Sequence, residues 1–310
     1  MKPAEIMLCA YGNHQVDKGI VILSYDKEKK SLIKERVLSL AGKCNLVSES
    51  EGVLYLSVKY PDGNKIELYD ASSLKKLKSY PSEYFYSYGQ VIENKFLLAS
   101  YESGVDSVFD FESECFVSHC VHQREGMSTQ SKSHYIQKLK DGQIIGIENG
   151  LQQMIVYKNM NLEIERIIEY PPVNIRLLAV HPDGKTAYMN TEFSNELIVL
   201  NTSDWSIQNR YKLADHEGWY SGGNAISSDG KYVCVSIRGE DVIHVFVNNG
   251  GCLHHQMKFC CGKTPRDLMF VGHDLFVTCT NDNKVEVYDM NNKCFKVCEA
   301  EVNQPITFKM

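Results

Sequence analysis

The chain has 310 residues and a formal net charge of −6, from 33 basic and 39 acidic side chains. Its basic residues are scattered, so we expect neither a nucleic-acid partner nor binding to an anionic membrane. The apolar run at residues 6–10 is too short for the core of a signal peptide, and no stretch reaches the length of a membrane span. We therefore expect a cytoplasmic protein.

Seven short apolar strands recur along the chain, and each closes on a bulky hydrophobic residue. The intervals between these landmark residues run from 40 to 48 residues, which is typical of a β-propeller with one four-stranded blade per repeat. Seven repeats use the whole of residues 1–310. We predict an all-β fold, a single seven-bladed β-propeller domain with four antiparallel strands per blade. The landmark residues are Tyr25, Tyr69, Phe109, Tyr157, Leu200, Phe246 and Tyr288.

A tight turn precedes the landmark strand in the fourth to seventh repeats. Asp-Gly between two alternating apolar runs is a strong hairpin signal, because glycine adopts a positive φ at little cost. The sequence therefore predicts a hairpin between the first two strands of each of these blades. The turns are Asp141-Gly142, Asp183-Gly184, Asp229-Gly230 and Gly272-His273-Asp274.

The two ends of the chain predict how the first blade is completed. Residues 305–310 read as an inner strand with no hairpin partner after it, whereas the first repeat begins at Glu5 without an inner strand before it. We expect the C-terminal strand to complete the first blade and so remove an exposed sheet edge. Truncation of the last six residues should then unfold the protein.

Eleven cysteines occur without the CxxC spacing that is typical of zinc or redox sites. Cys260 and Cys261 are adjacent, while Cys294 and Cys298 lie four residues apart. We expect free thiols that pack as small hydrophobic side chains, with no metal ion and no cofactor.

Polar residues at two positions of the repeat should face the same end of the propeller. In an antiparallel blade, the link after the second strand and the link into the first strand lie at one end, about 8 and 22 to 24 residues before the landmark residue. Each residue alone could be an exposed charge or part of an ion pair between blades, but the shared position favours a common site. The set comprises Tyr101, Glu192, Arg238 and Thr280 at the first position, and His134, Arg176 and Arg266 at the second.

The same residues lie in sequence patterns that occur in order and in phase. Residues 17–26 read DKGIVILSYD, 98–104 read LASYESG, 176–185 read RLLAVHPDGK and 191–195 read TEFSN. Residues 236–243 read SIRGEDVI and 262–267 read GKTPRD. Together they resemble the lactonase family of seven-bladed propellers, which is typified by bacterial 6-phosphogluconolactonase and is related to a fungal muconate-lactonising enzyme.

The resemblance implies a catalytic set of His134, Arg176, Glu192 and Arg238. Several positions depart from the family pattern and leave the identity of the lactone open. Lys132 stands where the family has a first histidine, and Val58-Lys59 stand in place of an Asn-Glu pair. Glu148-Asn149-Gly150 replace Asp-Leu-Gly, and Thr278-Cys279-Thr280 replace Ala-Asn-Gln.

Lactone hydrolysis needs an activated water, a group that stabilises the oxyanion and an anchor for the substrate. Glu192 and His134 are candidates for the general base. Arg176 and Arg238 suit the oxyanion or an anionic group of the substrate. The expected substrate-binding residues are Arg266, Lys132, Tyr101 and Thr280.

We therefore expect hydrolysis of a sugar lactone similar to 6-phosphogluconolactone, a step of the pentose phosphate pathway in carbohydrate metabolism. The expected partner is a small-molecule lactone or sugar phosphate, and the expected state is a monomer or weak homo-oligomer. Two alternatives stay open: a muconate-type cycloisomerase, and a non-catalytic propeller that binds a small anion or a protein partner.

The interval before the fourth landmark residue is the longest, and residues 115–133 account for it. This stretch is polar and contains His119, His122, Arg124 and Lys132. We interpret it as a surface loop, with a lid over the site as the alternative.

Overall fold

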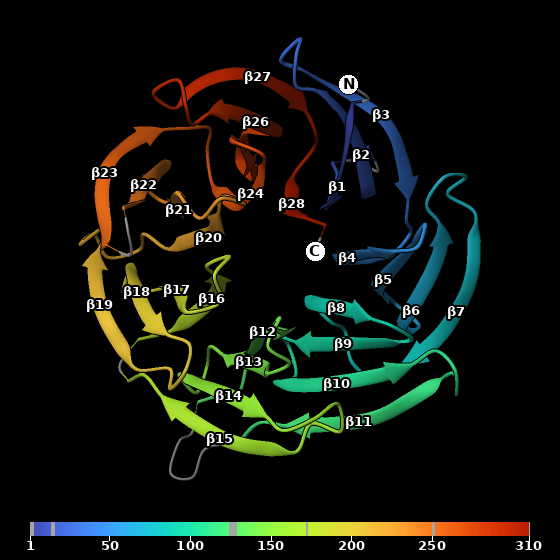
Figure 1. Cartoon of the computed structure of the whole chain (residues 1–310). Helices are drawn as coiled ribbons and strands as arrows, with labels where there is room; N and C mark the ends of the chain where they lie inside the picture. The colour runs from blue at the N-terminus through green and yellow to red at the C-terminus, as the bar shows by residue number, and fades with distance from the viewer. Residues whose placement is uncertain (1–2, 14–15, 124–128, 172, 250–251, 310) are drawn as a thin grey trace. The chain divides into compact units, whose positions relative to one another are not determined.

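The computed structural model describes residues 3–13, 16–123, 129–171, 173–249 and 252–309 (Figure 1). The described residues form 28 strands, which pair into seven antiparallel sheets of four strands each. These sheets are the seven blades of a β-propeller, so the predicted fold class is confirmed. Within the described ranges the single helical element is the short 3₁₀ turn η1 (Thr280–Asp282), and no helix is long and apolar enough to cross a membrane.

The chain divides into two compact units. The first unit covers residues 1–39 and 177–308, and the second covers 40–176 and 309–310. That the whole chain is one domain stays a prediction.

Four sheets belong to the first unit. One consists of β28 (Pro305–Phe308), β1 (Ala4–Ala10), β2 (Gly19–Asp26) and β3 (Ser31–Ser39), in that spatial order. The next is formed by β16 (Ile175–Val180), β17 (Thr186–Thr191), β18 (Glu196–Asn201) and β19 (Ile207–Lys212), although the first two residues of β16 fall in the second unit. The remaining two contain β20 (Ser221–Ile226), β21 (Tyr232–Ile237), β22 (Val242–Asn249) and β23 (Cys252–Cys260), and then β24 (Pro265–Val271), β25 (Asp274–Cys279), β26 (Lys284–Asp289) and β27 (Phe295–Glu301).

Three sheets belong to the second unit. The first consists of β4 (Lys43–Ser50), β5 (Val53–Tyr60), β6 (Gly63–Asp70) and β7 (Lys76–Ser82). The second sheet consists of β8 (Tyr88–Ile92), β9 (Lys95–Ser100), β10 (Val105–Asp110) and β11 (Cys115–Val121). The last sheet is made of β12 (Ser133–Lys138), β13 (Ile144–Glu148), β14 (Gln153–Tyr157) and β15 (Ile164–Glu169).

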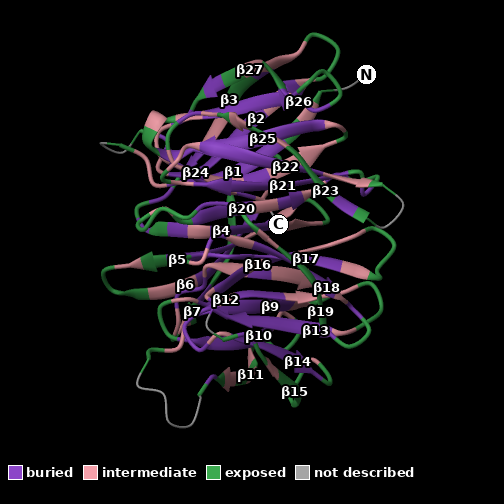
Figure 2. Cartoon of the chain, turned by 90° about the vertical axis from the view of Figure 1, so that its left-hand side faces the viewer, coloured by how far each residue is buried: buried purple, intermediate pink, exposed green. Residues whose placement is uncertain are grey.

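Burial follows the position of each strand within its blade. All seven landmark residues are buried, and each lies in the strand next to the outer one. Figure 2 shows middle strands such as β13 and β14 coloured as buried, whereas β11 and β15 carry exposed residues. The core therefore consists of side chains packed between neighbouring blades. One such cluster joins Tyr188 and Leu197 of one blade to Val233 and Phe246 of the next.

The predicted hairpin turns are present. Gly142 and Gly184 have φ values of +95° and +73°, the backbone region in which a side chain is strained. The predicted completion of the first blade is also confirmed, because β28 pairs antiparallel with β1 (Figure 1). All eleven cysteines lie in described residues and are free thiols.

The interpretation of residues 115–133 as a loop or lid is wrong for its first part, because β11 is the fourth strand of its blade. Arg124 lies outside the described residues. His119 Nδ1 lies 2.8 Å from Ser107 Oγ, and His122 Nε2 lies 3.2 Å from Asp106 Oδ2. Burial favours the neutral form of His122, but the charge of Asp106 outweighs it and raises the pKa of His122 to about 10. These two histidines therefore serve the packing of the blade.

Candidate active site

The predicted site residues occupy equivalent places in their blades. His134, Arg176 and Arg266 are each the second residue of a first strand, in β12, β16 and β24. The other four directly follow the end of a second strand: Tyr101, Glu192, Arg238 and Thr280. Antiparallel pairing places these positions at the same end of a blade, as the register Pro265↔Cys279 shows.

Glu192 and Arg238 form an ion pair in the first unit and are the central pair of the candidate site. Arg238 Nη2 donates to Glu192 Oε1 at 2.5 Å and to the carbonyl oxygen of Ser221 at 3.1 Å. The two side chains are only 16% (Arg238) and 12% (Glu192) exposed. Arg238 Nε is buried and has no hydrogen-bond partner among the described residues. The exposed part of this largely desolvated guanidinium can bind an anionic oxygen more strongly than a guanidinium in bulk water.

Backbone hydrogen bonds hold the two charged residues in place. The Ser221 N–H donates to the Glu192 carbonyl at 3.0 Å, and the Arg238 N–H donates to the Tyr220 carbonyl at 2.8 Å. The segment at 220–221 therefore links the turn after β17 to the residue that follows β21.

The buried side-chain amide of Asn190 supports this link. Asn190 Nδ2 donates to Ser221 Oγ at 2.7 Å and to the Gly222 carbonyl at 2.9 Å, while its Oδ1 accepts from the Leu177 N–H. Sequence reasoning missed Asn190 and Ser221. The available signal was an Asn, a residue that is rare in strands, within β17 (TAYMNT), two residues before Glu192.

Gly222 allows the chain to approach Arg238 closely. A Cβ atom at this position would lie 2.4 Å from the Pro265 carbonyl oxygen, 2.5 Å from Ser236 Oγ and 3.2 Å from Arg238 Cγ. Any side chain here would displace neighbours of the site.

Two further predicted residues lie in the first unit. Arg266 is half-buried, and it precedes Asp267, whose carboxylate accepts hydrogen bonds from Thr307 Oγ1 and the Phe308 N–H. Thr280 is buried, and its hydroxyl donates to the Pro305 carbonyl at 2.7 Å. The Thr280 hydroxyl thus has a structural hydrogen bond, and its part in substrate binding stays a prediction.

The second unit brings together Tyr101, Lys132 and His134. The rings of Tyr101 and His134 meet edge to face with centroids 5.4 Å apart, and Lys132 Nζ lies 5.3 Å from the centroid of Tyr101. Arg176 belongs to the same unit and is buried. The part that His134 and Arg176 play in catalysis stays a prediction.

Glu148 and Asn149, which depart from the family pattern, have structural roles. Glu148 is buried and accepts hydrogen bonds from Ser131 Oγ, the Lys132 N–H and the Leu151 N–H. Burial raises the pKa of the Glu148 carboxyl, although these hydrogen bonds oppose the shift. Asn149 Nδ2 donates to the Ile175 carbonyl at 2.9 Å. Both residues therefore fix segments that carry Lys132 and Arg176.

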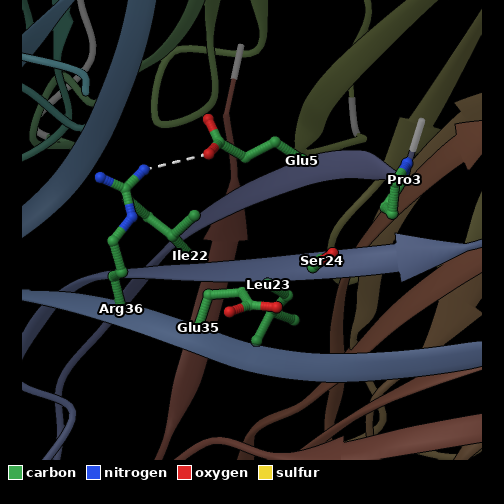
Figure 3. Close-up of a pocket in the computed structure, with 7 residues that line it drawn as sticks. All are labelled: Pro3, Glu5, Ile22, Leu23, Ser24, Glu35 and Arg36. Carbon is green, nitrogen blue, oxygen red and sulfur yellow. Dashed lines mark hydrogen bonds and ion pairs between the residues drawn. The ribbon is translucent and has the colours of Figure 1, made fainter.

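The part of the chain that the structure describes contains no group of three or more His, Cys, Asp or Glu side chains placed to hold a metal ion. A hollow of about 510 Å³ lies elsewhere, on the first blade, and Figure 3 shows the ion pair of Arg36 with Glu5 (3.1 Å) beside it. None of the predicted site residues lines this hollow, whose lining residues are Pro3, Glu5, Ile22, Leu23, Ser24, Glu35 and Arg36.

Comparisons with known proteins agree with this architecture. The 6-phosphogluconolactonase of Bacillus subtilis (strain 168) is 27% identical over 301 residues, which cover 86% of this chain and 84% of the relative. A crystal structure from Lactobacillus plantarum superimposes with a TM-score of 0.89 at 20% identity, covering 99% of each chain. The periplasmic gluconolactonase PpgL of Pseudomonas aeruginosa gives a TM-score of 0.84 at 16% identity, covering 100% of this chain and 99% of that chain.

The structural likenesses show the fold, whereas a family model shows membership. The model described as "Lactonase, 7-bladed beta-propeller" matches residues 8–307, almost the whole chain. The chain therefore belongs to the seven-bladed β-propeller lactonase family and is a hydrolase of the lactonase class.

Proposed function

We propose that this protein hydrolyses a sugar lactone, and that 6-phosphogluconolactone or a close analogue is the substrate. The observation that carries the proposal is the Glu192–Arg238 pair, in which a carboxylate and a guanidinium with a buried, unpartnered Nε meet at one site. The names of two similar proteins, a 6-phosphogluconolactonase and a gluconolactonase, support this substrate class.

The proposed reaction begins with proton transfer from a water molecule to the Glu192 carboxylate. The resulting hydroxide attacks the lactone carbonyl carbon, and the carbonyl oxygen becomes a tetrahedral oxyanion that Arg238 stabilises. The bond between this carbon and the ring oxygen then breaks, and the proton held by Glu192 passes to the ring oxygen. The products are a hydroxyl group and a carboxylic acid, which ionises in water.

We assign further roles to the remaining predicted residues. His134 is the second candidate for proton transfer, and Arg176 is a second group for the oxyanion or for an anionic substituent. Arg266 and Lys132 are the proposed phosphate contacts, since a cationic side chain can hydrogen-bond to phosphate oxygens. These roles distinguish a phosphorylated lactone from an uncharged one.

Replacement of Glu192 by Gln tests the mechanism, because Gln keeps the shape of the side chain and cannot accept the proton. We expect kcat for glucono-δ-lactone and its 6-phosphate to fall by about 10²- to 10⁴-fold, the usual contribution of a general base. Proton release at constant pH follows the reaction. Glu217→Gln, in the exposed segment before β20, is the matched control. Unchanged kinetics in Glu192→Gln would remove Glu192 from the mechanism.

The wild-type protein tests the substrate class. Stabilisation of the fold by sugar phosphates or sugar lactones, and not by dicarboxylates, is the expected result of a thermal-shift comparison. Stabilisation by dicarboxylates without lactone hydrolysis would refute the proposed substrate and favour cycloisomerase chemistry.

A further inference from the structure

Two exposed aromatic side chains lie beside the Glu192–Arg238 pair. Phe193 is 51% exposed and Tyr220 is 41% exposed, and their rings meet edge to face with centroids 5.3 Å apart. We call these two residues the aromatic shelf. Phe193 directly follows Glu192 in the chain, and the Arg238 guanidinium carbon lies 5.8 Å from the centre of the Tyr220 ring.

The position of the shelf is unusual for exposed apolar residues of this chain. Most other large, exposed apolar side chains lie on outer strands, on β3, β7, β11, β15, β19 and β27. The shelf instead lies between strands, in the turn after β17 and in the segment that leads into β20. Exposed aromatic surface next to a charged site is typical of ligand binding.

Hydrogen bonds fix the backbone of the shelf although its rings face solvent. Three consecutive residues take part: the Trp219 carbonyl accepts from Asn195 Nδ2 at 2.7 Å, the Tyr220 carbonyl accepts from the Arg238 N–H, and the Ser221 N–H donates to Glu192. The shelf therefore keeps a fixed position relative to both charged residues.

Trp219 anchors the segment further by packing against the core between two blades. Its ring also stacks on His216 with centroids 4.7 Å apart. Gly239 makes room for it, because a Cβ atom there would lie 2.3 Å from Trp219 Cδ1. The segment is thus held to the core through Trp219, while the next residue, Tyr220, stays exposed.

We propose that Phe193 and Tyr220 bind the C–H face of the lactone ring and so place its carbonyl group at Glu192 and Arg238. The inference rests on the proposed function and adds the residues that select a cyclic substrate. Aromatic rings offer a rigid apolar surface at low entropic cost, and a sugar ring presents such a C–H face while its hydroxyl groups stay hydrated at the edge. An open-chain acid has no fixed ring face, so the shelf favours the lactone over its hydrolysis product.

The test compares a cyclic ligand with an open-chain one. Gluconolactam keeps the ring and resists hydrolysis, and gluconate is the open-chain counterpart. Binding is followed through the fluorescence of Trp219 and by calorimetry. We expect Tyr220→Ala to weaken lactam binding by about tenfold, the order of one aromatic contact, and gluconate binding by less than about twofold. In hydrolysis, KM for the lactone should rise more than kcat falls.

Three variants separate this effect from a loss of folding. Tyr220→Phe keeps the ring, so it should restore lactam affinity to within about twofold of wild type. Phe193→Ala should weaken lactam binding in the same direction as Tyr220→Ala. Phe295→Ala removes an exposed ring (65% exposed) from β27 and should leave lactam binding unchanged.

Wild-type affinity for the lactam in both Tyr220→Ala and Phe193→Ala would overturn the shelf and leave the proposed function intact. Equal loss of lactam and gluconate binding would also overturn it, because the shelf predicts selection for the ring. If the wild-type protein neither binds the lactam nor hydrolyses the lactone, the proposed function is refuted and the shelf with it.

Discussion

Removal of residues 305–310 deletes β28, the strand that completes the first blade. Ile306 and Phe308 are both buried, and Phe308 belongs to a core cluster that includes Phe276. The Thr307 hydroxyl and the Phe308 N–H both donate to the carboxylate of Asp267, at 2.8 and 2.9 Å. The deletion therefore removes packing, hydrogen bonds and the pairing partner of β1 together.

The expected loss of stability follows from the two buried side chains. Truncation of a buried Ile costs about 2–5 kcal/mol, and truncation of a buried Phe costs about 3–5 kcal/mol. Their sum, about 5–10 kcal/mol, is comparable with the total stability of about 5–15 kcal/mol that is usual for a folded protein. The newly exposed edge of β1 also invites pairing with other chains. We expect the truncated protein to be unfolded or aggregated at 37 °C.

Urea denaturation followed by circular dichroism measures the effect. Phe308→Ala alone should lower the free energy of unfolding by about 3–5 kcal/mol. Lys309→Ala is the control, since its ion pair with Glu49 (2.8 Å) is partly exposed and contributes at most about 1 kcal/mol. A truncated protein that unfolds cooperatively at the wild-type urea midpoint would show that β28 does not support the fold.

Three further predictions concern buried polar groups and the site. Burial disfavours ionisation of Glu286, but hydrogen bonds, that of Tyr288 foremost, hold its pKa at about 2 against an ordinary value of 4.5. The resulting stability, about 3 kcal/mol, is present above pH 4.5 and should disappear as the pH falls towards 2. Glu286→Gln should therefore weaken the dependence of the urea midpoint on pH over this range. The raised pKa of His122 has the opposite sign: its stabilisation is complete below pH 6.5 and is lost as the pH rises towards 10, and His122→Asn should abolish this decline. Gly222→Ala should lower kcat/KM by about tenfold or more, because the new methyl group displaces the Pro265 carbonyl and the neighbours of Arg238; wild-type kinetics would contradict this.

The blade pattern could be predicted from the sequence because each blade repeats the same local chemistry. Asp141-Gly142 fixes a hairpin through the backbone freedom of glycine, and Tyr157 fixes the face of the following strand through its burial. Signals of this kind depend on neighbours in the chain, and they recur about every 44 residues. The pairing of β28 with β1 followed from the same regularity, since the first repeat lacked an inner strand and the C-terminal end carried one unpaired strand.

The polar contacts that support the site could not be predicted in the same way. Asn190 donates to residues about 30 positions away, and His122 lies against Asp106 across a strand pair. A histidine in a polar stretch has the same sequence appearance whether it is exposed or paired in the core. The sequence does not single out Tyr220, because its position depends on a hydrogen bond from the Arg238 N–H. Arg238 follows β21, whereas Tyr220 precedes β20 of the same blade. Contacts of this type arise when segments that are distant in the chain pack together, so they cannot be read from a single sequence.

The Glu192–Arg238 contact also explains how a partly buried site can tolerate the proposed reaction. Before the reaction the guanidinium faces the negative carboxylate at 2.5 Å. When Glu192 takes the proton of the attacking water, that negative charge disappears, and an equal charge develops on the lactone oxygen. In the proposed reaction Arg238 would therefore face one negative charge both before and after the proton transfer. Since the number of charges in the site does not change, little reorganisation of the surroundings is needed, and a fixed ring position on the aromatic shelf would place the oxyanion where Arg238 can reach it.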